Sequence, residues 1–449
     1  MSLFGTSGIR GPVGDEVTAA LALKVGRAVA SEGATTVLVG RDPRGSGELL
    51  ADAAKAGVRE CGADVVDLGM VSTPTLARSI ERHGADAGIV VTASHNPAPD
   101  NGLKLWNPSG QAYDTDQRER IESRILDEEF DLQAWDGLGD ESTEDNATAH
   151  HVDDLVASIR EEFDGGEEPL SGLSVAVDVG NGAGGETADA LTELGAHVHT
   201  LNAQPDGRFP ARPSEPTGEN CTALSAFVAE SDADLGIAHD GDADRMRAAT
   251  ESGQFVSGDT LLALFARAVV SEGDRVAAPL NVSLAIDDEL EARGASLTRT
   301  RVGDVFVAER ATEPDVVFGG ESSGAWIWPD ETLCPDGPLA ACKLAAIVAR
   351  DGSLDAQVDE IATYPLLREN REVEGKYDVM ARIEEAVTAA YDDAQVKTID
   401  GVHVETDAGW FLIRASGTQP LIRVKAQARS EADAEGLMAD ALGFLDDAQ

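Results

Sequence analysis

The sequence predicts an α/β protein with three α/β domains in series, built on mixed, mostly parallel sheets, and a smaller α+β domain at the C-terminus. Short apolar runs alternate with helical patterns from residue 35 to about residue 350, as is typical of parallel sheets. This alternation restarts twice, and after about Tyr364 it gives way to a hairpin flanked by helices. With 449 residues, the chain is also too long for one hydrophobic core.

The first expected domain covers residues 1–148. Its apolar runs of four or five residues predict strands, and the longer amphipathic stretches between them predict helices. The segment from Asp127 to His151 is acidic and has no apolar period, so we expect the domain boundary there. The expected strands are Thr36–Val39, Val65–Leu68 and Ala87–Val91, and the expected helices are Glu48–Glu60 and Pro74–Arg82.

The second and third expected domains cover residues 149–248 and 249–364. Each contains a polar, glycine-rich loop after a strand. Residues 365–449 form the fourth expected domain, with a hairpin between two helices. The expected strands are Leu173–Val177, Asp234–Ala238, Val276–Ala278, Val316–Phe318, Val402–Thr406 and Trp410–Ile413, and the C-terminal helices are Val379–Tyr391 and Glu431–Leu445.

The chain carries a formal net charge of −47. Its acidic residues are spread along the sequence instead of forming a tail, which indicates a folded protein with a carboxylate-covered surface. Such a surface suits a cytoplasm of high salt, where repulsion between charges is screened, so we predict a halophilic archaeon as the source. Because there is no basic stripe, we expect no binding to nucleic acid or to an anionic membrane.

Cysteine spacing and the N-terminal sequence predict the compartment. Cys61, Cys221, Cys334 and Cys342 form no Cys-x-x-Cys pair, which favours reduced thiols over a zinc site. The N-terminus has no apolar signal core, and no apolar run is long enough to cross a bilayer. We therefore expect a cytoplasmic protein that is a monomer or a homodimer.

A candidate reaction centre follows the apolar run Ala87–Val91. The sequence Thr-Ala-Ser-His-Asn-Pro places Ser94 and His95 directly after this run, and Lys104 follows in Asp-Asn-Gly-Leu-Lys. Ligands of open α/β sheets bind just beyond the carboxyl ends of strands. The Ser94 hydroxyl is therefore a candidate nucleophile. His95 alone is more typical of a structural hydrogen bond than of a base, but its position beside Ser94 favours a catalytic role.

A second loop has an aspartate at every second position: Asp240, Asp242 and Asp244. If the backbone curls, the three carboxylates converge on one cation, and such hard oxygen ligands suit Mg²⁺. A calcium-binding EF-hand loop is the rival interpretation, but Arg245 occupies the position that requires glycine and the loop follows a strand. A solvated acidic turn also stays open in so acidic a chain.

Two further loops carry residue types suited to sugars and phosphates. In Gly-Gly-Glu-Ser-Ser-Gly, Glu321 and Ser323 suit hydrogen bonds to vicinal hydroxyls, although a plain polar turn fits equally well. In Arg414–Pro420, a glycine-centred turn, two hydroxyls and a guanidinium form a candidate phosphate cradle, with Arg423 beyond it. A helix cap or an ordinary turn is the alternative for this last segment.

Two other glycine-rich loops are less informative. Gly180–Gly185 fits the dinucleotide-binding pattern G-x-G-x-x-G, but Leu201 and Asn202 stand where that fold needs an acidic residue. We interpret this loop as a structural turn between a strand and a helix. The N-terminal Phe4–Gly11 is either a flexible terminus or a loop in which Arg10 steadies a phosphate.

A hydroxyl nucleophile, a carboxylate metal site, a sugar-type loop and a phosphate cradle together suit phosphoryl transfer. In this combination the chain resembles the α-D-phosphohexomutase superfamily, whose motifs it matches in order over nearly its whole length. The resemblance implies four domains around a central cleft. The matching segments are Thr6–Gly11, Thr92–Pro97 with Asn101–Lys104, Asp240–Arg245, Gly320–Gly324 and Arg414–Pro420.

The resemblance also implies residue roles, with Ser94 a phosphoserine in the resting enzyme. One Mg²⁺ per chain and a hexose 1,6-bisphosphate, as activator and intermediate, are the implied cofactors. The implied catalytic residues are Ser94, His95, Lys104 and Arg10, and the implied metal ligands are Ser94, Asp240, Asp242 and Asp244. The implied substrate-binding residues are Arg245, Gly303, Glu321, Ser323, Arg414, Ser416, Gly417, Thr418 and Arg423.

The implied reaction is a relay that moves phosphate between O6 and O1 of a hexose phosphate through a 1,6-bisphosphate. The chain is most similar to archaeal-type phosphoglucosamine mutases, which implies glucosamine 6-phosphate as substrate. Phosphomannomutase/phosphoglucomutase activity is the alternative, and a Mg²⁺-dependent sugar phosphatase is a more distant one. A non-catalytic sugar-phosphate sensor is disfavoured, because Ser94 and the three aspartates are intact.

The chain departs from the family pattern at three positions. Many relatives have a histidine at the position of Ala325, and this chain therefore has no histidine there to act as acid or base. Ala415 replaces a common proline, and Gln419 replaces a common glutamate. We expect these two changes to alter the stiffness and charge of the phosphate loop more than the reaction.

Overall fold

The computed structural model describes residues 3–5, 7–392, 395–416 and 419–449. They form two compact units, each made of two stretches of chain. The first unit combines Met1–Leu261 with Ser323–Val358, and the second combines Leu262–Ser322 with Asp359–Gln449. The chain therefore passes from one unit to the other three times. The domain boundaries expected near residues 148, 248 and 364 stay a prediction.

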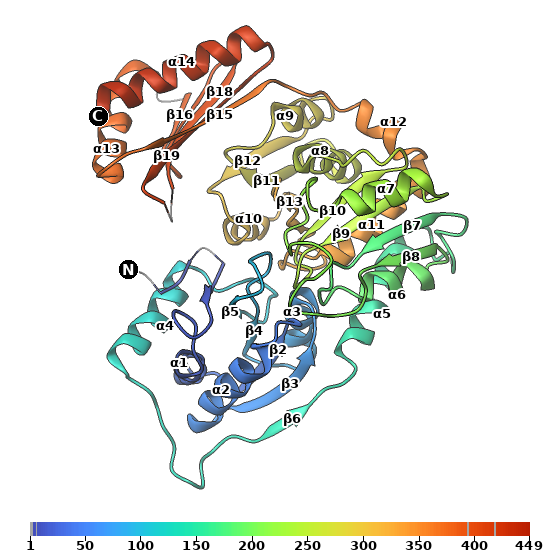
Figure 1. The fold of residues 1–449 in the computed structure, drawn as a ribbon, viewed down its shortest axis with the longest axis vertical. Coiled ribbons are helices and arrows are strands. Elements are labelled where there is room, and N and C mark those ends of the chain that lie inside the picture. The colour runs from blue at the N-terminus through green and yellow to red at the C-terminus, as the bar shows by residue number, and fades with distance from the viewer. Residues whose placement is uncertain (1–2, 6, 393–394, 417–418) are drawn as a thin grey trace. The chain divides into compact units, whose positions relative to one another are not determined.

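A six-stranded mixed sheet organises the N-terminal part of the first unit (Figure 1). Its strand order is β1-β5-β4-β2-β3-β6, with β4, β2, β3 and β6 parallel and β5 antiparallel to both of its neighbours. Because β4 and β5 are consecutive, the segment that joins them is a hairpin loop. The strands are β1 (Ile9–Pro12), β2 (Thr36–Arg41), β3 (Asp64–Met70), β4 (Ala87–Val91), β5 (Asp100–Trp106) and β6 (Glu141–Thr143).

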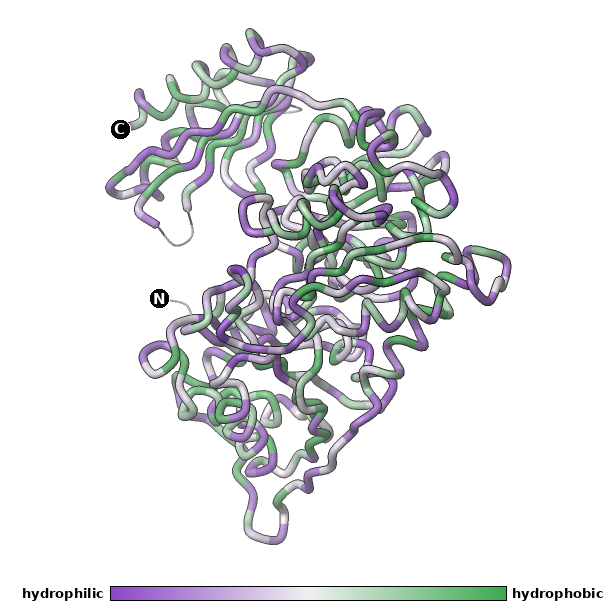
Figure 2. The backbone as a smooth tube through the Cα atoms, turned by 45° about the vertical axis from the view of Figure 1, so that its right-hand side comes forward, coloured by the Kyte–Doolittle hydropathy of each residue, from purple (hydrophilic) through white to green (hydrophobic). Residues whose placement is uncertain are grey.

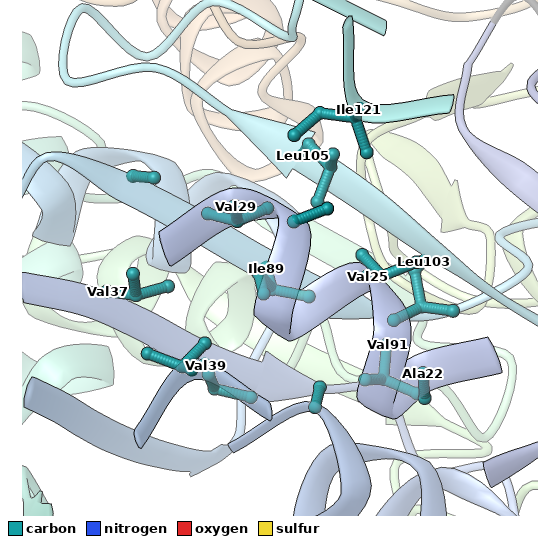
Figure 3. Close-up of a cluster of buried hydrophobic side chains, with 14 of the residues drawn as sticks. Ala22, Val25, Val29, Val37, Val39, Ile89, Val91, Leu103, Leu105 and Ile121 are labelled. Atoms are coloured by element: carbon teal, nitrogen blue, oxygen red, sulfur yellow. The ribbon is translucent and has the colours of Figure 1, made fainter. Parts of the chain in front are cut away.

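Helices cover both faces of this sheet. Side chains alternate between the two faces along each strand, and apolar side chains stand on both faces, so each face needs a covering layer. In β2, Val37 and Val39 belong to one core with α1 and α4, whereas Leu38 belongs to another with α3. Figure 3 shows the first core, to which α1, α4 and strands β2, β4 and β5 contribute. Each large apolar side chain buried there stabilises the fold by about 1.5–3 kcal/mol. The helices are α1 (Ala19–Ser31), α2 (Gly47–Glu60), α3 (Thr73–Arg82) and α4 (Thr115–Asp127).

A four-stranded sheet of order β10-β9-β7-β8 forms the rest of the first unit. Strands β9, β7 and β8 are parallel, and β10 returns antiparallel from β9. Helices α5, α6 and α11 pack against one another. The strands of this sheet are β7 (Ser174–Asp178), β8 (His197–Leu201), β9 (Leu235–His239) and β10 (Met246–Thr250), and the first unit also contains the short β14 (Trp326–Ile327) outside this sheet. The helices are α5 (Ala147–Glu162), α6 (Glu186–Glu193), α7 (Thr222–Glu230), α11 (Gly337–Asp351) and α12 (Leu354–Asp359), while α8 (Gly258–Val269) crosses into the second unit.

The second unit contains the parallel strands β12, β11 and β13 and a fully antiparallel sheet of order β15-β19-β18-β17-β16. Helices α13 and α14 pack on one face of the antiparallel sheet (Figure 1). The elements are β11 (Arg275–Pro279), α9 (Leu284–Glu291), β12 (Ser296–Thr300), α10 (Asp304–Ala311), β13 (Val316–Gly320), β15 (Leu366–Glu372), α13 (Lys376–Ala390), β16 (Val396–Lys397), β17 (Val402–Glu405), β18 (Gly409–Ala415), β19 (Leu421–Ala428) and α14 (Glu431–Ala448).

These sheets confirm the predicted fold class, with mixed, mostly parallel sheets followed by an antiparallel α+β part. The segment from Asp127 to His151 differs from expectation, because it contains β6 and the first turn of α5. All three residues of β6 are exposed, and the strand is held by its pairing with β3. A strand without a buried face leaves no apolar pattern in the sequence.

Hydrophilic residues occur along the entire tube in Figure 2, in keeping with a net charge of −47 that is not confined to one segment. Among the helices in the described part of the chain, none has both the length and the apolar character that a bilayer crossing requires.

Candidate active site

Ser94 lies in the hairpin loop between β4 and β5 and is 1% exposed. Its φ angle is 52°, in the left-handed region, which costs a residue with a side chain roughly 1–2 kcal/mol. In this conformation the Ser94 hydroxyl donates a hydrogen bond of 2.6 Å to Oδ2 of Asp240. The strained residue thus faces the aspartate loop of the same unit.

The three aspartates occupy the hairpin loop between β9 and β10. Asp240, Asp242 and Asp244 are all buried, and one carboxylate oxygen of each lies within 4.8 Å of the others. Gly241 allows this loop to approach Ser94, since a Cβ at Gly241 would lie 2.8 Å from the Ser94 carbonyl oxygen. The two hairpin loops therefore meet through backbone as well as side chains.

Backbone contacts from later in the chain support the aspartate loop. The amide of Gly337 donates to the carbonyl of Ala243 at 3.1 Å, and the amide of Met246 donates to the carbonyl of Gly324 at 2.9 Å. On the other side, Ala183 donates to the carbonyl of Gly241 at 3.0 Å. Ala183 belongs to the glycine-rich turn 180–185, which therefore packs against the aspartate loop as the structural turn that we expected.

Lys104 on β5 supplies positive charge to this cluster. Its ammonium donates to Oδ2 of Asp242 at 2.7 Å and to Oδ2 of Asp244. Burial lowers the pKa of Lys104, but these two carboxylates outweigh burial and raise that pKa above its ordinary value. Burial likewise raises the pKa of Asp242, but Lys104 outweighs it and holds this pKa well below its usual range.

The single positive charge of Lys104 does not balance the three buried carboxylates. Burial, followed by the charges of Asp244 and Asp242, raises the pKa of Asp240 well above its ordinary value. In addition, Oδ1 of Asp242 is buried without a hydrogen-bond partner, which is costly for a charged group. Three carboxylates beside a hydroxyl are hard oxygen ligands, so these residues fit a divalent cation such as Mg²⁺.

The other predicted catalytic residues of the first unit also lie at this site. Nδ1 of His95 is 3.5 Å from the Ser94 hydroxyl oxygen, and burial, then the charges of Arg245, Arg10 and Lys104, lower the pKa of His95 to about 2. His95 is therefore a neutral imidazole at neutral pH. The amide of Arg245 donates to Oδ1 of Asp240 at 3.2 Å, and Arg10 lies on β1 beside β5.

Thr73, at the start of α3, is a site residue that the sequence analysis missed. Its hydroxyl donates to Oδ2 of Asp242 at 2.6 Å, and its amide donates to the carbonyl of Asp242 at 2.9 Å. The preceding Ser72 caps the helix by accepting a hydrogen bond from the Thr75 amide. Helix α3 thus fixes the middle aspartate of the loop, which no pattern in the sequence around Thr73 indicates.

We expect Thr73→Val to weaken Mg²⁺ binding about tenfold, because loss of a hydrogen bond behind a metal ligand typically costs 10–100-fold in affinity. The measurement is the Mg²⁺ dependence of the unfolding temperature. Thr260→Val is the control, since Thr260 is also buried but its hydroxyl contacts Ser257. Equal Mg²⁺ affinity in both variants would contradict a role for Thr73 at Asp242.

The remaining predicted binding residues lie mostly in the second unit. Glu321 accepts a hydrogen bond of 2.6 Å from the amide of Gly303, so these two candidate sugar-binding residues are adjacent. Gly303 has a φ of 133°, a conformation that favours glycine. Ser323 is half-buried and belongs to the first unit.

The candidate phosphate loop follows β18. Arg414 and Arg423 face each other across β18 and β19, whereas Gly417 and Thr418 lie outside the described residues. Two residues missed by the sequence analysis hold this loop: Lys376 donates to the carbonyl of Ser416, and Asp400 accepts from Arg414 at 2.8 Å. Asp400 also accepts from the amide of Val302 at 3.1 Å, which links the loop to the segment that contains Gly303.

Family models for phosphoglucomutase/phosphomannomutase match the chain in four parts: α/β/α domain I at residues 1–132, domain II at 151–253, domain III at 257–364 and the C-terminal domain at 365–443. A protein of Methanococcoides burtonii named "probable phosphoglucosamine mutase" is 43% identical, over 98% of this chain and 100% of its own length. A protein of Methanopyrus kandleri with the same name is also 43% identical, over 97% and 95%. The crystal structure of a phosphoglucomutase/phosphomannomutase family protein from Burkholderia thailandensis has a TM-score of 0.87 and 29% identity, over 99% of this chain and 97% of that one.

Proposed function

The chain belongs to the phosphoglucomutase/phosphomannomutase family, and on this premise we propose that it is an isomerase that interconverts glucosamine 6-phosphate and glucosamine 1-phosphate through a phosphoserine at Ser94. The observation that carries the proposal is the hydrogen bond from the Ser94 hydroxyl to Asp240 inside a buried cluster of three aspartates and Lys104. A nucleophile beside a cation site is what phosphoryl transfer requires.

The proposed metal ligands are Asp240, Asp242, Asp244 and an oxygen on Ser94. A phosphoryl group on Ser94 adds up to two negative charges beside three carboxylates, and Lys104 alone does not balance them. The partnerless Oδ1 of Asp242 supports the same conclusion. When bound, Mg²⁺ would supply Lewis-acid stabilisation of the charge on the phosphoryl oxygens.

In the first half-reaction, a sugar hydroxyl attacks the phosphorus of phospho-Ser94. A phosphorus–oxygen bond to the sugar forms as the bond to Ser94 breaks, the sugar hydroxyl proton passes to a base, and the departing Ser94 oxygen takes up a proton to become the hydroxyl that donates to Asp240. His95, beside Ser94, is the proposed acceptor; this role requires the negative charge of phospho-Ser94 to raise the pKa of the imidazole above the value of about 2 that it has beside the unmodified serine, while Lys104 and Arg10 stabilise negative charge. In the second half-reaction, the 1,6-bisphosphate has reoriented, and the Ser94 hydroxyl attacks its other phosphoryl group and gives up its proton to a base. The bond from that phosphorus to the sugar oxygen breaks, and the released sugar oxygen takes up a proton.

The relay requires a second phosphate site, because one phosphate is held while the other is transferred. We assign that role to Arg414, Ser416, Gly417, Thr418 and Arg423, and sugar recognition to Gly303, Glu321 and Ser323, with Arg245 contacting the substrate or the phosphoserine. The convergence of Arg414 and Arg423 supports phosphate binding, since guanidinium groups bind phosphate oxygens through paired hydrogen bonds. The contact between Glu321 and Gly303 supports a common sugar-binding site built from two loops.

The substrate is tested by comparing kcat/KM for the 6-phosphates of glucosamine, glucose and mannose in low salt and in molar KCl. We expect glucosamine 6-phosphate to be preferred by at least about tenfold, since a site built for a polar group discriminates against sugars that lack it. A much lower rank for glucosamine would favour phosphomannomutase/phosphoglucomutase activity. Release of inorganic phosphate without isomerisation would indicate a phosphatase.

The same assay tests the proposed halophilic origin. A net charge of −47 destabilises the folded chain by self-repulsion, which salt screens, so we expect higher activity in molar KCl. A cytoplasmic location and a monomeric or homodimeric state stay predictions.

A further inference from the structure

Arg44 is a buried guanidinium directly beneath the loop that carries Ser94. It follows β2 and is 1% exposed, and it lies outside every motif identified in the sequence. Its Nε donates to the carboxylate of Asp42 at 2.9 Å. Its other two nitrogens donate four hydrogen bonds of 2.7–2.8 Å to carbonyl oxygens of the hairpin, those of Ser94, Asn96, Pro97 and Asp100.

These bonds use all five N–H groups of the guanidinium. The ring of Phe209 covers the group, with its centroid 4.9 Å from the guanidinium carbon. Gly207 also packs closely, since a Cβ there would lie 2.2 Å from the Arg44 Cα. Arg44 is therefore buried away from substrate, and the partners of its guanidinium are the hairpin loop, Asp42 and Phe209.

The Asp42–Arg44 pair holds both backbone groups of Ser94, its carbonyl directly and its amide through Thr92. Arg44 donates to the Ser94 carbonyl at 2.8 Å. Asp42 accepts a hydrogen bond of 2.7 Å from the Thr92 hydroxyl, whose oxygen in turn accepts one of 2.9 Å from the Ser94 amide. With both backbone groups held, Ser94 keeps a φ of 52° that an unsupported serine would leave.

We infer that Arg44 is a positioning residue for phosphoryl transfer. By donating hydrogen bonds to four carbonyl oxygens of the hairpin loop, its guanidinium holds the Ser94 hydroxyl in place against the aspartate cluster. This inference rests on the proposed function of Ser94. Lysine cannot replace arginine here, because its three N–H groups cannot satisfy four carbonyls and a carboxylate. A loop released by such a change moves the nucleophile, and displacement by 1 Å can cost about 100-fold in rate.

The test is Arg44→Lys, with Arg78→Lys as the matched control. Arg78 is also largely buried and paired with an aspartate, Asp336, but makes no hydrogen bond to the Ser94 loop. We expect both variants to lower the unfolding temperature. We expect only Arg44→Lys to lower kcat about 100-fold, with KM for the sugar phosphate changed less than about threefold, because Arg44 does not touch the sugar.

Amide hydrogen exchange of residues 93–101 gives a readout that does not depend on activity. We expect faster exchange in Arg44→Lys and unchanged exchange in the control. Equal kcat per folded molecule in the two variants, or equal exchange, would overturn the inference. If the wild type neither isomerises sugar phosphates nor acquires phosphate on Ser94, the proposed function fails instead, whatever the exchange shows.

A second variant covers the case in which Arg44→Lys does not fold. Asp42→Asn keeps the size of the side chain and removes the charge that anchors Arg44 and Thr92. We expect it to lower kcat at least about tenfold with KM nearly unchanged, and to speed exchange in the same loop. Wild-type kcat in Asp42→Asn would count against the inference.

Discussion

Ser94→Ala is expected to lower mutase turnover at least about 10⁴-fold, because no other described hydroxyl occupies the position 2.6 Å from Asp240 from which phosphate would be transferred. Alanine leaves the buried loop without a bulky replacement, so we expect the unfolding temperature to stay close to that of the wild type. The measurements are kcat with glucosamine 6-phosphate and a hexose 1,6-bisphosphate, and mass spectrometry of the peptide that contains residue 94.

Ser79→Ala is the control for this variant. Ser79 is also buried, but its hydroxyl donates to the Thr75 carbonyl within α3. We expect wild-type kcat in the control and a phosphopeptide only where Ser94 is present. Normal turnover by Ser94→Ala in the presence of bisphosphate would refute the phosphoserine relay.

Removal of Mg²⁺ is expected to abolish activity and to lower the unfolding temperature, because the buried carboxylates of Asp240, Asp242 and Asp244 then repel one another. Mg²⁺ at 100 times its dissociation constant should stabilise the fold by about 2.7 kcal/mol. In Asp242→Asn this stabilisation should largely disappear, together with activity. The measurements are thermal unfolding and kcat after chelation and after readdition of Mg²⁺.

Asp232→Asn is the control for loss of charge. Asp232 is exposed, so this substitution removes one negative charge, as Asp242→Asn does, but away from the aspartate cluster. We expect its response to Mg²⁺ to match that of the wild type. A wild-type unfolding temperature that does not change with Mg²⁺ would exclude the proposed metal site. Equal responses to Mg²⁺ in the wild type, Asp242→Asn and Asp232→Asn would place the Mg²⁺ site elsewhere.

The sequence predicts the parts of this site whose residues are neighbours in the chain. The aspartates alternate within one loop, and Ser94 follows a run of five apolar residues that the structure confirms as β4. Both patterns are local, so composition and spacing are sufficient to find them. The antiparallel hairpin of the C-terminal sheet was predictable for the same reason.

Supporting residues could not be predicted, because their partners are brought close only by the fold. Arg44 meets Pro97 and Asp100 once β2 and β4 pair, and Thr73 meets Asp242 only when the start of α3 reaches the loop between β9 and β10. Lys376 and Asp400 likewise reach the phosphate loop from elsewhere in the second unit. For a single arginine, threonine or lysine, no sequence pattern distinguishes a buried residue that supports a loop from one that is exposed to solvent.

The backbone support of the aspartate loop bears on the order in which the protein is made. Ser94 and all three aspartates leave the ribosome well before Gly324 and Gly337, whose backbone groups hold Met246 and Ala243 in place. A nascent chain that ends at Ser322 therefore contains the proposed nucleophile and the carboxylates, but not the residues whose backbone hydrogen bonds support the aspartate loop. The first unit can complete this cluster only after synthesis has passed through a stretch of the second unit, so the candidate site forms late although its proposed reactive residues are synthesised early.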